Sequence, residues 1–185
     1  MSEIYRAVCC AVKSYCEEKG YCEGPGVNNF VPHDAVAAFG MSRHLVRDIG
    51  GFDHYLAVAP EGHIYGYFFE QFGAKTMEVH VPYPPDDIRV IDELSVVRGK
   101  RVLIIEDDVI SGTSLRLVVT ELLRHEPAEI HLFLGHSRGI QHLVNVPVEI
   151  SRTYLSDEIY TLADVASLKV EFSSLFSSRS HSNCK

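Results

Sequence analysis

One stretch, residues 102–114, constrains the fold of this chain more than any other. It reads Val-Leu-Ile-Ile-Glu-Asp-Asp-Val-Ile-Ser-Gly-Thr-Ser. Four aliphatic residues in a row predict a strand that is buried on both faces, as in a parallel sheet. Three carboxylates follow at its carboxyl end, the edge where open α/β sheets bind their ligands. The stretch therefore predicts an α/β fold with a ligand site at these acids.

A short loop of small residues joins the acids to a predicted helix. Apolar side chains recur there at positions i, i+3, i+4, i+7 and i+8. They are Leu115, Val118, Val119, Leu122 and Leu123. Residues 111–114 thus lie at a helix N-terminus, where free N–H groups and the helix dipole favour an anion, typically phosphate. Acids beside a phosphate loop suit a ribose 5-phosphate, because carboxylates accept hydrogen bonds from sugar hydroxyls.

Two other interpretations of this stretch compete with that one. The plainest is a strand-turn-helix with solvated acids and a capping serine. A receiver domain also has a strand that ends in clustered acids, but there the cluster ends the first strand and a phosphoacceptor Asp ends a later one. Here about a hundred residues precede the acids, and no convincing second Asp is found. A Walker A loop is absent, since no segment reads G-x-x-x-x-G-K-[ST].

The stretch resembles the signature of the type I phosphoribosyltransferases: an aliphatic strand, two acids, two apolar residues and a short Thr/Ser/Gly loop. The resemblance covers about residues 53–155. It implies an α/β fold with a parallel sheet, helices on both faces and a small hood over the nucleobase. It also implies a Mg²⁺-dependent transfer of 5-phosphoribosyl from phosphoribosyl pyrophosphate to a nucleobase-like nitrogen acceptor, with release of pyrophosphate.

The resemblance also assigns roles to residues of the signature. Glu106 and Asp107 would be catalytic and would hold the ribose hydroxyls and Mg²⁺, directly or through water. The ribose 5-phosphate loop would comprise Asp108, Val109, Ile110, Ser111, Gly112, Thr113 and Ser114.

The acceptor base stays open. Hypoxanthine-guanine enzymes have an Asp, a candidate general base, at the position of Ile110, whereas adenine and orotate enzymes lack this Asp. Hypoxanthine-guanine enzymes also use a Lys near the start of the hood to read the purine oxygen. The position that loosely matches this Lys is Glu149, which would repel a carbonyl and could accept from an amine.

A second strand-loop-helix pattern lies earlier in the chain. Residues 55–59 predict the first core strand, and residues 64–72 predict a helix. The turn between them, Pro60, Glu61, Gly62 and His63, lies where the resembled family has its pyrophosphate loop. That loop often reads Pro-x-Gly-Gly with a basic residue at x, where this chain has an acid. Glu61 would repel a pyrophosphate unless Mg²⁺ lies between them or its side chain points away.

The remaining patterns predict the flanking elements. We expect helices over residues 3–18, from about 32–34 to 48, and over 157–168 with Ser156 as the cap. Further strands are expected over residues 75–81 and 129–134, and an extended segment is expected to start at 146–150. Residues 82–89 form a proline-rich connection. From residue 173 the tail is polar and rich in Ser, which predicts disorder.

Three basic residues of the second predicted helix have two interpretations. Arg43, His44 and Arg47 are either a solvated face or a basic patch near the diphosphate, supplied across a dimer interface.

Composition limits the partners and the location. A net charge of −8 and a pI of about 5.6 argue against a nucleic-acid or anionic-membrane partner. No apolar run approaches the length of a membrane span. Five cysteines, an odd number, and the lack of a signal peptide predict reduced thiols and a cytoplasmic location. The length predicts one domain over residues 1–185. The resemblance implies a hood formed by one or both ends and a homodimer.

A second function fits the same pattern. Some proteins with this fold are non-catalytic regulators or sensors that bind phosphoribosyl pyrophosphate or a nucleotide. The altered pyrophosphate loop is consistent with such a role, whereas the low pI argues against a DNA-binding version.

Overall fold

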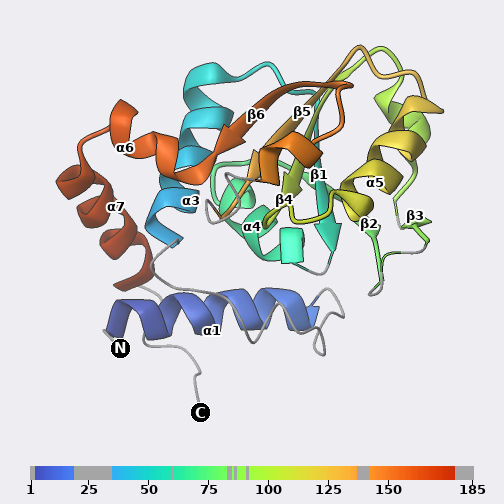
Figure 1. Cartoon of the computed structure of the whole chain (residues 1–185). Helices are drawn as coiled ribbons and strands as arrows, with labels where there is room; N and C mark the ends of the chain where they lie inside the picture. Colours follow the sequence, from blue (N-terminus) through green and yellow to red (C-terminus); the bar gives the residue numbers. More distant parts are fainter. Residues whose placement is uncertain are drawn as a thin grey trace.

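The computed structural model describes residues 3–18, 35–59, 61–82, 85, 87–90, 92–136 and 142–177. Six strands form one sheet in the order β3-β2-β1-β4-β5-β6 (Figure 1). All neighbouring strands run parallel except β3, which is antiparallel to β2. The bounds are β1 His54–Ala59, β2 Thr76–His80, β3 Arg89–Val90, β4 Arg101–Glu106, β5 Glu129–Leu134 and β6 Ile150–Leu155. The predicted parallel α/β sheet is confirmed.

Helices cover both faces of this sheet. On one face lie α1 (Glu3–Glu18), α3 (Ala35–Arg43), the π-helix η1 (His44–Ile49), α4 (Glu61–Glu70), α6 (Ile159–Leu162) and α7 (Val165–Ser177). On the other face lie α5 (Thr113–Leu123) and the 3₁₀ helix η2 (Leu94–Val97). A 3₁₀ turn, η4 (Ser156–Glu158), joins β6 to α6. Figure 1 shows α5 separated from α3, α6 and α7 by the sheet.

The signature strand β4 is buried on both faces, as its unbroken aliphatic run predicted. Leu103 and Ile105 pack into the cluster under α1, α3 and α4, whereas Val102 and Ile104 pack into the cluster under α5. All four side chains are fully buried. Parallel strands covered on both faces need apolar residues at every position, and this is why β4 lacks the usual alternation.

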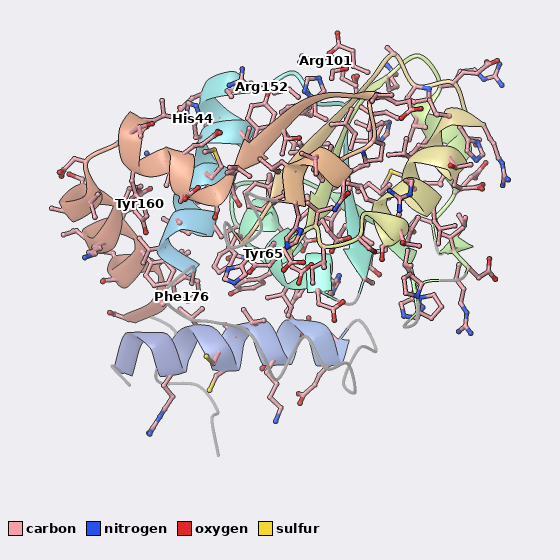
Figure 2. All side chains as sticks on the ribbon, viewed as in Figure 1. His44, Tyr65, Arg101, Arg152, Tyr160 and Phe176 are labelled. Carbon is pink, nitrogen blue, oxygen red and sulfur yellow. The ribbon has the colours of Figure 1, made fainter. Side chains whose placement is uncertain are left out.

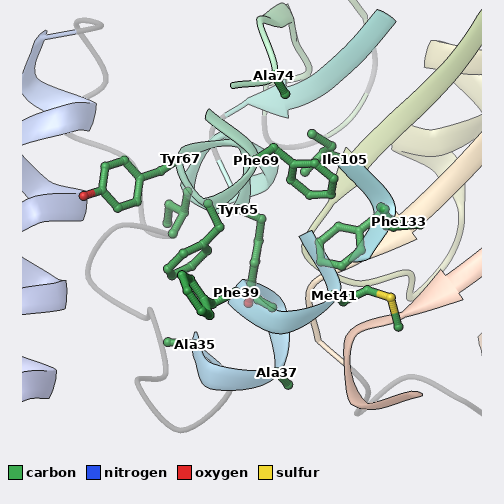
Figure 3. Close-up of a cluster of buried hydrophobic side chains, with 14 of the residues drawn as sticks. Ala35, Ala37, Phe39, Met41, Tyr65, Tyr67, Phe69, Ala74, Ile105 and Phe133 are labelled. Atoms are coloured by element: carbon green, nitrogen blue, oxygen red, sulfur yellow. The ribbon is translucent and has the colours of Figure 1, made fainter. Parts of the chain in front are cut away.

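The larger cluster is aromatic and joins the two ends of the chain. In Figure 3, Phe69 of α4 lies against Ile105 of β4 and Phe133 of β5, while Tyr67 points towards α1. The rings of Phe69 and Phe133 meet edge to face at 5.0 Å between centroids. Such ring pairs stabilise a core beyond their buried area by about 1 kcal/mol each.

The C-terminal helical region differs from the prediction in two ways. The predicted helix over 157–168 is broken, because Asp164 caps a new helix, α7: its Oδ2 accepts the Ser167 N–H at 2.8 Å. Ser156 does not act as a cap, since its hydroxyl donates to the Gly135 carbonyl at 2.9 Å. The prediction of disorder from residue 173 is wrong as far as Ser177, where α7 ends. Residues 178–185 lie outside the described residues.

The connection after β2 turns back onto the sheet. Its Asp92 accepts the backbone N–H of Glu78 at 2.7 Å, and its own N–H donates to the Glu78 carbonyl at 3.2 Å. These two bonds hold the short strand β3 beside β2, an element that the sequence patterns did not predict.

The expectation of reduced thiols is wrong for Cys10, which is disulfide-bonded, whereas Cys9 is free. Within the described ranges, every helix is too short or too polar to cross a bilayer.

Candidate active site

A cavity of about 640 Å³ opens at the carboxyl ends of β1, β2 and β4. Strands β1 and β4 are neighbours, and the helices that follow them, α4 and α5, lie on opposite faces. This is the topological switch point at which open α/β sheets bind ligands. The lining consists of Val58, Ala59, Glu61, Val81, Pro85 and the run from Glu106 to Leu115. The structure thus brings the predicted acids and the predicted phosphate loop together in one cavity.

The two signature acids lie at the inner end of this cavity. Glu106 is the last residue of β4 and only 7% exposed, and one of its carboxylate oxygens accepts the N–H of Asp107 at 3.0 Å. Burial raises the pKa of Glu106 well above its ordinary value, and the neighbouring charge of Asp107 raises it further. Burial also raises the pKa of Asp107 to about 6. Adjacent carboxyls, of which Glu106 is buried, resist double ionisation unless a cation lies beside them.

A third acid, Glu61, projects into the cavity from the first turn of α4. Burial raises its pKa, the charge of Asp108 adds to the rise, and the charge of His80 opposes it. The described lining residues include four carboxyls, those of Glu61, Glu106, Asp107 and Asp108. They include no Lys, Arg or His. An anionic ligand can enter only with compensating positive charge from a cation or from backbone N–H groups.

Gly62 explains how Glu61 reaches the other acids. A Cβ on Gly62 would lie 2.2 Å from the Ile105 carbonyl oxygen and 3.1 Å from the Glu106 Cα. Only glycine allows the start of α4 to touch the end of β4 this closely. This close approach to a neighbouring strand sets Glu61 beside Glu106.

The structure differs from the predicted pyrophosphate loop in the placement of His63. Glu61, Gly62 and His63 form the first turn of α4, and Pro60 lies outside the described residues. The His63 side chain is completely buried, with Nδ1 2.6 Å from a carboxylate oxygen of Glu78, and its ring stacks on Tyr15 of α1. It points into the helical layer and does not line the cavity. The expectation that His63 faces a pyrophosphate is contradicted by this placement.

The predicted phosphate loop lies at the start of α5, as expected. Gly112 has φ of 71° and ψ of 9°, the left-handed conformation that favours glycine, and α5 begins at Thr113. The hydroxyls of Ser111 and Thr113 lie 3.0 Å apart, and the Thr113 N–H donates to the Ser111 hydroxyl at 3.3 Å. Two hydroxyls and a helix N-terminus therefore face the same cavity, which suits a phosphate group.

None of the three basic residues of the second helix, Arg43, His44 and Arg47, lines this cavity. Arg43 pairs with Glu171 of α7, and the Arg47 guanidinium lies over the Phe72 ring, 5.1 Å from its centroid. Figure 2 shows His44 at the upper left of the molecule, and its Nδ1 lies 2.9 Å from a carboxylate oxygen of Asp48. Within this chain these three residues serve packing and surface contacts, which agrees with the plainer of the two interpretations.

Comparison with known families identifies the segment that carries the site. Residues 70–146 match the family model described as a phosphoribosyl transferase domain. This part of the chain is a phosphoribosyl transferase domain. The match confirms the resemblance to the phosphoribosyltransferases that the signature stretch indicated. No curated protein sequence shows a significant match.

Several solved structures resemble this phosphoribosyl transferase domain. A purine phosphoribosyltransferase from Pyrococcus horikoshii is 19% identical over 68% of this chain and 84% of its own, with a TM-score of 0.48. A protein from Neisseria gonorrhoeae, solved with bound ppGpp, is 17% identical over 74% of this chain and 95% of its own, with a TM-score of 0.45. The protein AQ2163 from Aquifex aeolicus is 16% identical over 55% of this chain, with a TM-score of 0.42. The chain spans about half the length of that last protein, 52%.

Three polar residues near this cavity were not predicted from the sequence. His80, at the end of β2, lowers the pKa of Glu61 by its electrostatic interaction with that carboxyl. Arg116 and Asn145 hydrogen-bond to the phosphate loop. The sequence could have indicated Arg116, because it lies about one helical turn after Gly112 and therefore close to the phosphate loop. Asn145 is about thirty residues away in the sequence, and no local pattern connects it with the loop.

Glu149, the loose match to the family's base-reading Lys, lies away from the site. Its side chain is exposed, and it does not line the cavity. The structure therefore gives this residue no contact with a ligand bound between β1 and β4.

The signature acids fit an open, partly hydrated metal site better than a closed one. Among the described residues, no group of three or more His, Cys, Asp or Glu side chains has a metal-binding arrangement. Mg²⁺ keeps several waters and takes one or two carboxylates plus ligand phosphates, so Glu106 and Asp107 suffice for it. Burial raises the pKa of both carboxyls, and a cation beside them would stabilise their ionised forms.

Proposed function

We propose that this protein is a Mg²⁺-dependent phosphoribosyltransferase. It would transfer 5-phosphoribosyl from phosphoribosyl pyrophosphate to a ring nitrogen of a nucleobase-like acceptor and release pyrophosphate. One observation carries the proposal: the acids that end β4 and the anion loop that begins α5 line a single cavity at the switch point of the sheet. A ribose 5-phosphate has hydroxyls at one end and a phosphate at the other, which matches this arrangement.

The chain's own residues would act by binding and orientation. Ser111, Gly112, Thr113 and Ser114 would hold the 5-phosphate, and Glu106 and Asp107 would accept hydrogen bonds from the ribose hydroxyls. In the reaction the bond from ribose C1 to the pyrophosphate oxygen breaks and a bond from C1 to the acceptor nitrogen forms. Positive charge develops on the ribose as the first bond lengthens, and the nearby carboxylates stabilise it. Positioning of the two reactants supplies much of the remaining acceleration.

Glu106 and Asp107 would also hold Mg²⁺, directly or through water. Bound Mg²⁺ supplies positive charge to the diphosphate oxygens, and this cavity needs it because four carboxyls line it. Ile110, at the position of the family's candidate base, has no titratable atom and is 65% exposed at the rim. The acceptor therefore has to lose its proton without help from this side chain.

Pyrophosphate release tests the proposed activity. We expect purified protein with phosphoribosyl pyrophosphate and MgCl₂ to release pyrophosphate with at least one member of a panel of free bases. Asp107→Asn should abolish release while leaving the protein folded. Binding of phosphoribosyl pyrophosphate without release for any base would reject the enzyme and favour the alternative below.

The alternative is a regulator or sensor that binds phosphoribosyl pyrophosphate or a nucleotide without turnover. The observation that favours it is Glu61, which occupies the cavity where the resembled family has a basic residue. A site that repels free pyrophosphate suits a nucleoside monophosphate better than a diphosphate. The homodimer and the cytoplasmic location remain predictions from the sequence.

A further inference from the structure

Two consecutive carbonyl groups of the phosphate loop are held by side chains from other parts of the chain. Asn145 donates its Nδ2–H to the Ile110 carbonyl at 2.6 Å, and Arg116 donates its Nη2–H to the Ser111 carbonyl at 2.9 Å. Residues 110–114 line the cavity, whereas Asn145 and Arg116 do not. Both donors therefore hold the loop from its outer side.

The direction of these carbonyls determines the direction of the N–H groups. In a planar trans peptide the C=O and the following N–H point in opposite directions. Carbonyls held outward by Asn145 and Arg116 turn the N–H groups of Ser111 and Gly112 towards the cavity. Over the ranges that the structure describes, neither of these two N–H groups donates to a protein acceptor. Both are thus available to a ligand.

Gly112 completes this arrangement. Its left-handed conformation places successive N–H groups in a concave turn, the geometry that forms anion-binding nests. A Cβ on Gly112 would lie 2.3 Å from the Asn145 carbonyl oxygen, so the loop lies directly against the segment around residue 145. The segment around residue 145 is itself held in place, because Leu143 and Val146 pack onto the core under α5. It can therefore support the phosphate loop.

We propose that Arg116 and Asn145 are positioning residues that aim the N–H groups of Ser111 and Gly112 at the phosphate of the ligand. The inference rests on the proposed function to the extent that the ligand carries a 5-phosphate. It identifies one source of positive potential, besides Mg²⁺, in a cavity whose described lining has four carboxyls and no cationic side chain. The Arg116 guanidinium is not part of the cavity lining, and it acts through the loop, where its Nη2 also lies 3.5 Å from the Thr113 hydroxyl.

The test uses ribose 5-phosphate as the probe, with MgCl₂ present, and three variants of the full chain. Arg116→Gln and Asn145→Ala each remove one donor to the loop. Arg124→Gln is the matched control: it removes the same charge from the C-cap of the same helix, two turns later, where Arg124 pairs with Glu121 on the surface. Substitution of Gly112 itself would be a poor test, because any side chain there is strained and meets the Asn145 carbonyl.

We expect Arg116→Gln and Asn145→Ala to weaken ribose 5-phosphate binding by on the order of tenfold, the usual cost of misplacing charge-assisted bonds. Arg124→Gln should bind within about twofold of the wild type. In ¹H–¹⁵N spectra the amide signals of Ser111 and Gly112 should shift downfield with the probe in wild type and shift less in the two loop variants. The ratio of Kd values between Arg116→Gln and wild type should persist at about 0.5 M salt, where long-range charge effects are screened.

Two results would overturn the inference. One is affinity of both loop variants equal to that of Arg124→Gln. The other is a Kd ratio that falls to one at high salt, which would make Arg116 a distant charge and not a support of the loop. If the wild type binds no ribose 5-phosphate, the proposed function and this inference fail together. If the wild type binds and the variants match it, only the inference fails.

Discussion

Gly62 of α4 lies against Ile105 of β4 so closely that a Cβ on Gly62 would come within 2.2 Å of the Ile105 carbonyl oxygen. This contact joins the two strand-loop-helix units that build the site. It holds the first turn of α4 against the carboxyl end of β4, and it thereby sets Glu61 beside Glu106 and Asp107 in one cavity.

The first prediction follows from this contact. Gly62→Ala should lower the free energy of unfolding by at least about 1–3 kcal/mol, because the backbone atoms that meet the new methyl group cannot rotate away. Gly66→Ala, one turn later in α4, is the matched control. Its Cβ would meet only the Ala57 and Thr76 side chains at 3.5 Å, an ordinary contact. Urea unfolding of the two variants measures the difference, and equal stability would show that α4 can move away from β4.

The second prediction concerns Asp107 and stability. Burial raises its pKa from the ordinary value of 3.8 to about 6, so the folded protein binds more protons than the unfolded chain between these values. Stability from this group is therefore present at low pH and is lost as pH rises through about 6. Asp107→Asn removes that loss and should be more stable than wild type at pH 7, by on the order of 1–3 kcal/mol.

The stability difference between Asp107→Asn and wild type should shrink below about pH 4, where both side chains are neutral. Thermal unfolding across pH measures it. A lower melting temperature for Asp107→Asn at pH 7 would mean that the carboxylate has a structural partner. In that case the assignment of Asp107 to the site would be wrong.

The third prediction concerns Mg²⁺ affinity and pH. A cation binds the ionised carboxylate, so protons compete with Mg²⁺ when the pH falls below the pKa. With a pKa of about 6 for Asp107, Mg²⁺-dependent binding of phosphoribosyl pyrophosphate should change little above pH 7 and weaken steadily below pH 6. Asp107→Asn should bind weakly with a flatter profile. Calorimetric titrations between pH 5 and pH 8 give the result, and an identical profile in both proteins would place the metal elsewhere.

The fourth prediction separates Glu61 from His63. Glu61→Ala should strengthen phosphoribosyl pyrophosphate binding at low Mg²⁺ and reduce its Mg²⁺ dependence, since one of four lining carboxyls is lost. His63→Phe should leave that affinity unchanged, because the ring stacks on Tyr15 outside the cavity. It should instead lower the melting temperature by leaving Glu78 buried without its His63 contact. Weaker ligand binding by a folded His63→Phe variant would show that His63 contributes to the ligand site and would contradict this prediction.

Local patterns in the sequence determined much of this protein. The aliphatic run of β4, the acids after it and the amphipathic spacing of α5 identified the fold class, the signature and the phosphate loop. Each of these signals lies in residues that are close together in the sequence. Burial on both faces requires a continuous aliphatic run, and a helix that starts at a given residue shows its apolar spacing from there. Expectations failed where one residue decided a helix boundary, as Asp164 did for α7.

Only the tertiary structure decided which way side chains point and which distant residues meet. His63 and Glu61 lie two residues apart in one helical turn, yet burial against Tyr15 takes His63 out of the cavity while Glu61 faces into it. Asn145 reaches the Ile110 carbonyl across 35 positions of sequence. The spacing of apolar residues in the sequence does not predict such contacts, because they depend on how the sheet and its helices pack. The sequence by itself thus determined the chemistry present at the end of β4, and packing determined which residues orient it.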